Sequence, residues 1–157
     1  MKKILFLLVA FCALCACSGE RKYLNCHGLS MGMSAKAMAD SFEARGLAVD
    51  THATNATQIV LADTVARNYM LTIFHQGDTI SDILEQYTAT YNDSTSNLWQ
   101  AIHDELQKEL DTWPGMPHHG DLHKEADYTT DAGTIVLTLL NTYSPTVTVR
   151  YSTQVNQ

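Results

Sequence analysis

Two stretches of the chain, 76 residues apart, align with each other without gaps and constrain the fold more than any other feature. The first, NATQIVLADTVARNYMLTIFH, begins at Asn55, and the second, DAGTIVLTLLNTYSPTVTVRY, begins at Asp131. Both contain the string IVL, and Thr72 of the first matches Thr148 of the second. Each is preceded by a helical pattern and one further strand. The match predicts two copies of a helix-then-three-strand unit, although two β-rich hairpins could also match by chance.

The first helix is predicted at 34–45, in the segment SAKAMADSFEAR. Ser34 is a suitable N-cap, because its hydroxyl can accept a hydrogen bond from a free N–H of the first turn. Gly46 follows the segment and suits a left-handed C-cap. The predicted apolar face of this helix consists of Ala35, Met38, Ala39 and Phe42.

Two further helices are predicted in the middle of the chain. The segment SDILEQYTATY, at 81–91, carries three apolar or aromatic residues at helical spacing: Ile83, Leu84 and Tyr87. The segment 97–112 and the residue after it show the clearest amphipathic pattern, with apolar residues at steps of three or four: Leu98, Ile102, Leu106, Leu110 and Trp113. Pro114 and Gly115 follow and are expected to end this helix.

The remaining segments have the alternation and β-branched composition of strands. In chain order they are LAVDTHA, QIVLAD, YMLTIFH, HKEADYT, GTIVLTLL and TVTVRYST. Two units of this kind, side by side, would form an α+β, two-layer fold, in which helices pack on one face of a single antiparallel sheet. We therefore expect one domain over 24–157, with pseudo-repeats at about 24–77 and 78–154.

This layout resembles a group of small envelope proteins that includes the beta-lactamase inhibitor protein, BamE-like assembly lipoproteins and PepSY-like domains. The segment GLSMGMSAKAMADSFEARGL is similar to the helix starts of that group. The chain as a whole also resembles small lipoproteins of Bacteroides-type bacteria. The resemblance covers about residues 23–153 and includes no catalytic motif. It implies a binding, inhibitory or assembly role by analogy, because a fold does not determine a function.

The N-terminus has the features of a lipoprotein signal. MKK is a short basic segment, and ILFLLVAFCAL is an apolar run that is too short to span a bilayer. The string LCAC that follows, which ends at Cys17, resembles the lipobox of bacterial lipoproteins. The resemblance implies a signal peptide at 1–16, a diacylglycerol thioether on Cys17, and a lipidated tether at 17–23 that holds the protein to a membrane.

The predicted location is the bacterial cell envelope, at the outer membrane and facing the periplasm. The string SGERK after Cys17 lacks the acidic run that marks surface export in Bacteroides-type lipoproteins, although surface display stays an alternative. Without Lys2 and Lys3, 8 basic residues face 17 acidic ones, a net charge of −9. Such a surface disfavours nucleic acid as a partner.

Cleavage before Cys17 would leave Cys26 as the one free thiol, so no intramolecular disulfide is expected. Cys26 lies in a short predicted strand and is followed by His27. Consecutive residues of a strand point to opposite faces, so these two side chains are not expected to pair. Cys26 is expected to be buried and inert.

The segment GMPHHGDLHKEA contains four side chains that are acceptable ligands of Zn²⁺: His118, His119, Asp121 and His123. The same segment leads into a predicted strand in which alternate residues are polar. Polar alternation is also what a solvent-facing strand surface looks like. The sequence therefore leaves two interpretations open, a metal site and a polar strand face.

The sequence contains no Gly-rich phosphate loop, no G-x-S-x-G elbow, no H-E-x-x-H and no CxxC motif. We therefore expect a non-catalytic role without a cofactor, in which the domain binds another envelope protein or a peptide. The alternative is a metal-binding protein or metal-dependent enzyme that uses Zn²⁺ at the HHGDLH segment. Trp99 lies one step from the predicted apolar stripe at 97–112, so we expect it to be an exposed partner contact.

Overall fold

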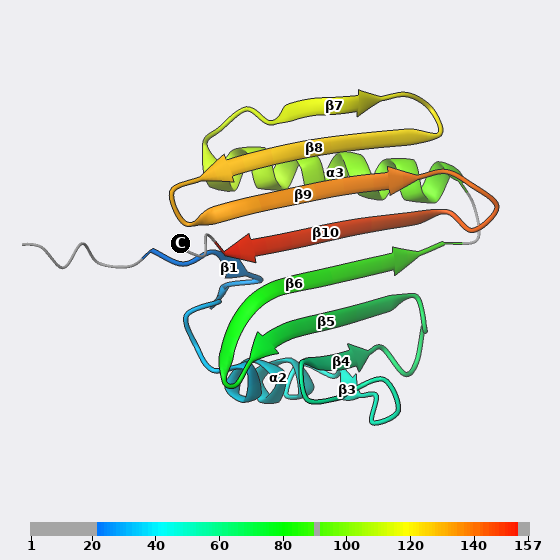
Figure 1. Cartoon of the computed structure of the whole chain (residues 1–157). Coiled ribbons are helices and arrows are strands. Elements are labelled where there is room, and N and C mark those ends of the chain that lie inside the picture. Colours follow the sequence, from blue (N-terminus) through cyan, green and yellow to red (C-terminus); the bar gives the residue numbers. More distant parts are fainter. Residues whose placement is uncertain (1–21, 90–91, 154–157) are drawn as a thin grey trace, which may run out of the picture.

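The protein has an α+β fold, in which the described residues form an eight-stranded antiparallel sheet, two helices and a small separate hairpin (Figure 1). The computed structural model describes residues 22–89 and 92–153. The predicted signal peptide and the predicted lipid anchor Cys17 lie outside these ranges. Among the described residues, neither helix combines the length and the apolar character that a membrane span requires.

Each helix is followed by four strands of the sheet, not by the predicted three. The first half contains β1 (Asn25–Cys26), β2 (Leu29–Ser30), α2 (Ala35–Glu43), β3 (Ala48–Val49), β4 (Gln58–Ala62), β5 (Tyr69–Gln76) and β6 (Thr79–Thr88). The second half contains α3 (Asn92–Leu110), β7 (Gly115–His119), β8 (His123–Thr130), β9 (Gly133–Leu140) and β10 (Thr146–Thr153). Strands β1 and β2 form the small hairpin, and the sheet order is β3-β4-β5-β6-β10-β9-β8-β7. The last strands of the two halves, β6 and β10, therefore pair at the centre.

The predicted helix at 81–91 is wrong, because most of this segment belongs to strand β6. β6 pairs along its length with β5 on one side and with β10 on the other. Hydrogen bonds to these two neighbouring strands satisfy the backbone N–H and C=O groups of β6, so the segment does not need the internal hydrogen bonds of a helix. In the strand, Ile83 and Tyr87 lie on one face, whereas Leu84 lies on the other.

Helix α2 forms as its sequence predicts. The Ser34 side chain accepts a hydrogen bond of 3.1 Å from the backbone N–H of Ala37, which confirms Ser34 as the N-cap. Gly46 adopts a positive φ of 102° after the helix ends, as expected for a left-handed cap. The four residues of the predicted apolar face are all buried: Ala35, Met38, Ala39 and Phe42.

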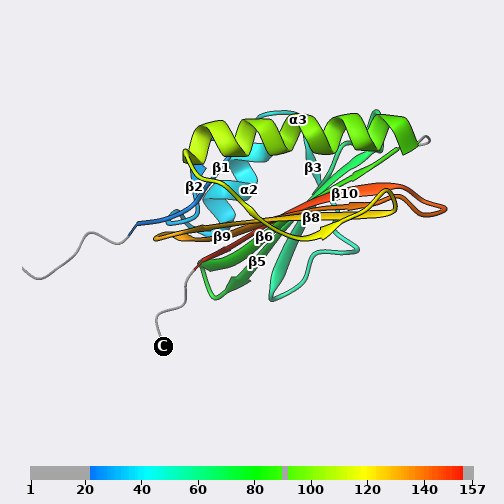
Figure 2. The same ribbon diagram turned by 90° about the horizontal axis from the view of Figure 1, so that it is seen from above.

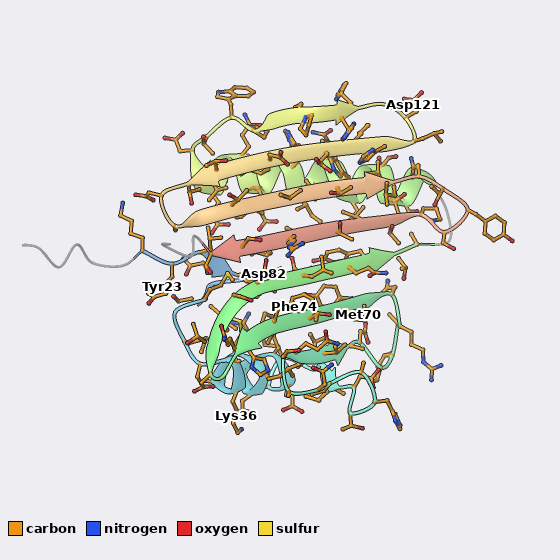
Figure 3. The ribbon with its side chains drawn as sticks, viewed as in Figure 1. Tyr23, Lys36, Met70, Phe74, Asp82 and Asp121 are labelled. Carbon is orange, nitrogen blue, oxygen red and sulfur yellow. The ribbon has the colours of Figure 1, made fainter. Side chains whose placement is uncertain are left out.

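Both helices cover the same face of the sheet (Figure 2). Helix α2 packs on β3, β4 and β5, and α3 packs on β9 and β10. Four residues of the predicted stripe on α3 contact the core: Leu98, Ile102, Leu106 and Leu110. The fifth, Trp113, lies beyond the end of the helix and is 84% exposed. On the opposite face neither of the two described helices covers the sheet, and side chains such as Met70, Phe74 and Asp82 project from β5 and β6 there (Figure 3).

Candidate functional site: a cleft beside a buried carboxylate

Among the residues that the structure describes, one carboxylate, that of Glu85, interrupts the buried face of the sheet. Six residues on neighbouring strands pair side by side in a row below the helices: Leu61, Leu71, Glu85, Val149, Leu137 and Ala126. Each of the six is at most 1% exposed, and five of them are apolar. Burying a carboxylate in such surroundings is unfavourable unless hydrogen bonds compensate for the lost water. The partners of Glu85 therefore define the site.

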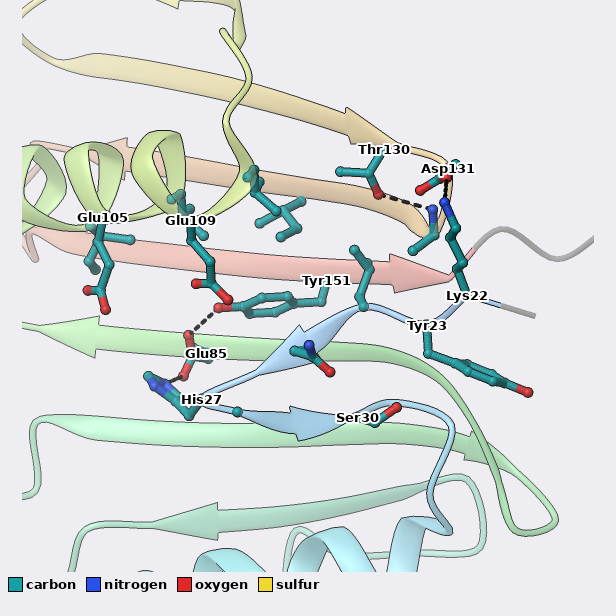
Figure 4. A pocket seen from close by; sticks show the side chains of 18 of the residues that line it. Lys22, Tyr23, His27, Ser30, Glu85, Glu105, Glu109, Thr130, Asp131 and Tyr151 are labelled. Atoms are coloured by element: carbon teal, nitrogen blue, oxygen red, sulfur yellow. Dashed lines mark hydrogen bonds and ion pairs between the residues drawn. The ribbon is translucent and has the colours of Figure 1, made fainter. Parts of the chain in front are cut away.

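Three side chains lie within hydrogen-bond distance of the Glu85 carboxylate, and two of them, His27 and Tyr151, are drawn in Figure 4. The Tyr69 hydroxyl donates to Oε1 at 2.6 Å, and the Tyr151 hydroxyl donates to Oε2 at 3.4 Å. The two tyrosines lie on the strands either side of β6, and each is placed diagonally to Glu85 by the register of the sheet. Diagonal cross-strand neighbours are within reach of long aromatic side chains. The third partner is His27, whose Nε2 lies 2.5 Å from Oε1.

His27 reaches Glu85 from the turn of the β1–β2 hairpin, not from a strand. Its φ is 50°, a left-handed conformation that is uncommon for a residue other than glycine. Arg45 holds this turn by donating a hydrogen bond of 3.0 Å from Nη1 to the His27 carbonyl. The expectation that Cys26 and His27 point to opposite faces is therefore wrong, because strand β1 ends at Cys26 and the chain folds back at His27.

The protonated form of His27 is favoured by this arrangement. The hydrogen bond to Glu85 raises the pKa of His27 above its ordinary value, and partial burial of the ring opposes that shift without cancelling it. The His27 side chain is 47% exposed, whereas the Glu85 side chain is 2% exposed. The imidazole therefore stands between the buried carboxylate and solvent.

Cys26 lies next to this pair and is fully buried, as its sequence position predicts. Burial, together with the nearby charge of Glu85, raises the pKa of the thiol far above its ordinary value, so the thiol is protonated at neutral pH. One ligand atom each from Cys26, His27 and Glu85 lies within 4.8 Å of the other two. Among the residues that the structure describes, this is the one group of three potential metal ligands at such short range.

A cleft of about 1080 Å³ opens above these residues, between α3 and the β1–β2 hairpin. Its floor includes Glu85 and Tyr151, and its α3 wall carries apolar side chains that include Ile102. The same wall carries Glu105 and Glu109, which extend from α3 toward the strands that bear Glu85 and Tyr151 (Figure 4). The cleft thus combines an apolar wall with the carboxylates of Glu85, Glu105 and Glu109.

The predicted metal ligands of the HHGDLH segment lie far from this cleft in the sheet order, at the β7 edge. His118 and His119 are exposed and consecutive in β7, so they point to opposite faces of the sheet. His118 stacks on His123 with ring centroids 4.3 Å apart, and Asp121 is exposed in the turn between the strands. In the described part of the chain, these four side chains do not come together as a group of three ligands.

Trp99 is buried, so the expectation that it is exposed is wrong. Its side chain is 3% exposed and stacks on His103, with ring centroids 5.0 Å apart. The Lys124 ammonium lies 5.5 Å from the centroid of the indole ring and covers it from β8. Trp99 therefore helps to attach α3 to the sheet.

No site is predicted from the sequence at Glu85 or at its neighbours. The segment that carries Glu85 has the spacing of a helix, so a buried carboxylate in a strand is not expected there. One sequence feature could have indicated the site. If the segment is taken as a strand, Glu85 lies on the same face as Ile83 and Tyr87, which is the buried face. Comparisons of the chain with protein-family models, with curated proteins and with solved structures found no match. Function is therefore inferred from the residues of the cleft.

Proposed function

We propose that the protein is a non-catalytic binding protein, and that its cleft holds a peptide segment in which a basic side chain is flanked by apolar ones. The observation that carries this proposal is the position of Glu105 and Glu109, which share one apolar wall above the buried Glu85. A cleft of about 1080 Å³ is slightly larger than the clefts that hold drug-sized ligands, which measure roughly 300–1000 Å³. A few residues of a peptide fit that space.

The charges of the cleft favour a cation. Glu105 and Glu109 make no ion pair with a basic side chain that the structure shows in its described ranges. Lys22, a basic residue on the rim, is already paired with Asp131. Clustered charges of one sign in a cleft with apolar walls raise the local concentration of oppositely charged ligands.

The apolar wall favours a ligand that carries apolar groups beside its positive charge, rather than a free cation. Four leucine or isoleucine side chains of α3 line the cleft: Leu98, Ile102, Leu106 and Leu110. Leu98, Ile102 and Leu110 are only partly buried, so apolar surface remains available for a ligand to cover. Covering apolar surface contributes about 25 cal/mol per Å², which is a sizeable share of the affinity of a short peptide.

The predicted lipid anchor belongs to this proposal. Lys22 and Tyr23 line the rim of the cleft, and Cys17 precedes Lys22 by only five residues. A lipidated Cys17 would hold the cleft near the membrane surface, in the cell envelope. Its ligand would then be a segment of another envelope protein or a free peptide in the same compartment. No observation on the HHGDLH segment favours the alternative of a metal-dependent enzyme over this role.

The test uses the full chain in detergent and the probe acetyl-Leu-Lys-Leu-Leu-amide. We expect the peptide to shift the backbone amide resonances of α3 and of the β1–β2 hairpin. The double variant Glu105→Gln, Glu109→Gln should weaken binding by about tenfold, because it removes two charges near the lysine. Glu43→Gln, on the exposed side of α2, is the matched control and should bind normally. Equal binding of a probe with Gln in place of Lys, or shifts confined to β7, would contradict the proposal.

A further inference from the structure

We propose that Cys26, His27 and Glu85 form a binding site for one Zn²⁺ ion at the floor of the cleft. The proposal rests on the positions of these three side chains and does not depend on which ligand the cleft binds. Thiolate, imidazole and carboxylate are the three types of protein ligand that Zn²⁺ takes. The mixture of one sulfur with nitrogen and oxygen favours Zn²⁺ over the hard cations Mg²⁺ and Ca²⁺, which prefer oxygen alone.

The distances allow such a site with small movements. A tetrahedral Zn²⁺ ion with bonds of about 2.0–2.3 Å holds its ligand atoms roughly 3.3–3.8 Å apart. The three atoms here lie within 4.8 Å of one another, and His27 Nε2 lies 2.5 Å from Glu85 Oε1. An ion between them would increase the distance between His27 Nε2 and Glu85 Oε1 by about 1 Å. The exposed imidazole is the side chain with room to make that adjustment.

The side chains around these three residues would hold the ligands in position. The hydroxyls of Tyr69 and Tyr151 already donate to the Glu85 carboxylate and would keep it oriented toward an ion. The left-handed turn at His27 places the imidazole on the same side of the hairpin as the Cys26 sulfur. Uncommon backbone conformations of this kind concentrate at functional sites, where other contacts enforce them.

Metal binding would exchange protons for the ion. The S–H bond of Cys26 and, where His27 is protonated, its Nε2–H bond break as the S–Zn and N–Zn bonds form, and these protons leave to water through the open cleft. A coordinating thiol is deprotonated by the charge of the ion, so the high pKa of the free Cys26 thiol does not prevent the exchange. With three protein ligands, the fourth position faces the cleft and would hold a water molecule or a group of the bound ligand.

The experiment is a zinc titration of the full chain in detergent, in which Cys12, Cys15 and Cys17 are replaced by serine. Cys26 is then the only thiol, because the sequence contains four cysteines. Zn²⁺ alone is titrated against a chromophoric chelator, and Co²⁺ is used as a spectroscopic substitute. We expect one ion per chain and, with Co²⁺, the charge-transfer absorption that only a thiolate ligand produces.

Three variants decide the assignment. Cys26→Ser should abolish the cobalt charge-transfer band, and His27→Gln, at an exposed position, should weaken Zn²⁺ binding at least tenfold. The double variant His119→Ala, His123→Ala should change neither result. Circular dichroism of each variant separates loss of a ligand from loss of the fold.

Absence of binding would show that the three side chains form a hydrogen-bonded network only. Loss of binding in the His119, His123 variant alone would show that the ion binds at the β7 edge. Either result overturns the proposal.

Discussion

The Tyr69 hydroxyl on β5 donates a 2.6 Å hydrogen bond to the Glu85 carboxylate on β6. Burial, together with the charge of Glu85, raises the pKa of Tyr69 far above its ordinary value, so the hydroxyl keeps its proton and remains a donor. The Tyr87 ring packs against the Tyr69 ring, with centroids 4.8 Å apart, and holds it in place. A buried charge is thus stabilised by a neutral donor whose position is set by the sheet.

The first prediction concerns Tyr69→Phe, which removes this donor and leaves the ring. The free energy of unfolding should fall by about 1–3 kcal/mol, because a buried carboxylate loses a charge-assisted hydrogen bond. Urea unfolding followed by circular dichroism measures the change. Tyr143→Phe is the matched control, since the Tyr143 side chain is fully exposed, and it should have no measurable effect. An unchanged midpoint for Tyr69→Phe would mean that the remaining partners of Glu85 suffice.

The second prediction concerns Gly133, the first residue of β9. Its φ is 150°, and a Cβ atom there would overlap the carbonyl oxygen of Ser152 on β10. Gly133→Ala should therefore destabilise the protein by more than about 2 kcal/mol, or prevent folding. Gly115→Ala is the control, because a Cβ atom at Gly115 meets nothing closer than 3.9 Å. Thermal unfolding of both variants measures the difference, and equal stability would refute the strained position of Gly133.

The third prediction is a pH dependence that originates on the open face of the sheet. The Asp82 carboxylate accepts hydrogen bonds from Ser152 at 2.8 Å and from Arg150 at 2.9 Å. Partial burial acts to raise the pKa of Asp82, but these hydrogen bonds outweigh it, and the pKa lies below its ordinary value. A carboxyl group whose pKa is lower in the folded state stabilises the fold at every pH above its unfolded pKa of about 3.9.

This stabilisation should disappear as the pH falls through the folded-state pKa of Asp82. The difference in unfolding free energy between the parent chain and Asp82→Asn should be constant above about pH 5 and shrink below about pH 4. Urea unfolding at a series of pH values measures it. Asp121→Asn, at an exposed turn, should stay within about 0.5 kcal/mol of the parent near neutral pH. A difference for Asp82→Asn that grows on acidification would have the wrong sign for this mechanism.

Helix α2 and the strands of the second half could be predicted from the sequence, because their local signals agree with the tertiary structure. Ser34 caps α2 and Gly46 follows it, as their side-chain and backbone properties require. The strands of the second half, such as β9, follow from their alternation and β-branched composition. The offset of 76 residues, however, aligns β4 with β9, whereas β4 and β8 hold equivalent places in the sheet order. The internal repeat therefore stays a prediction.

The centre of the fold could not be predicted, because the residues of the candidate site break the local pattern. Glu85 occupies a buried position between Ile83 and Tyr87, and its charge masks the alternation of β6. The approach of His27 to Glu85 depends on a left-handed turn at a residue other than glycine, which is uncommon. Such conflicts between local and global preference are expected at functional sites.

The last prediction concerns the two tryptophans, which the structure places in opposite environments. Trp99 is 3% exposed and Trp113 is 84% exposed, and the chain contains no other tryptophan. In Trp113→Phe, the emission of the remaining Trp99 should be blue-shifted and resist quenching by acrylamide. In Trp99→Phe, the remaining Trp113 should emit at longer wavelength and be quenched readily. Trp99→Ala should also lower the free energy of unfolding by about 3–5 kcal/mol, because it leaves a cavity under α3. Efficient quenching of Trp99 would show that α3 is not packed on the sheet and would restore Trp99 as an exposed contact.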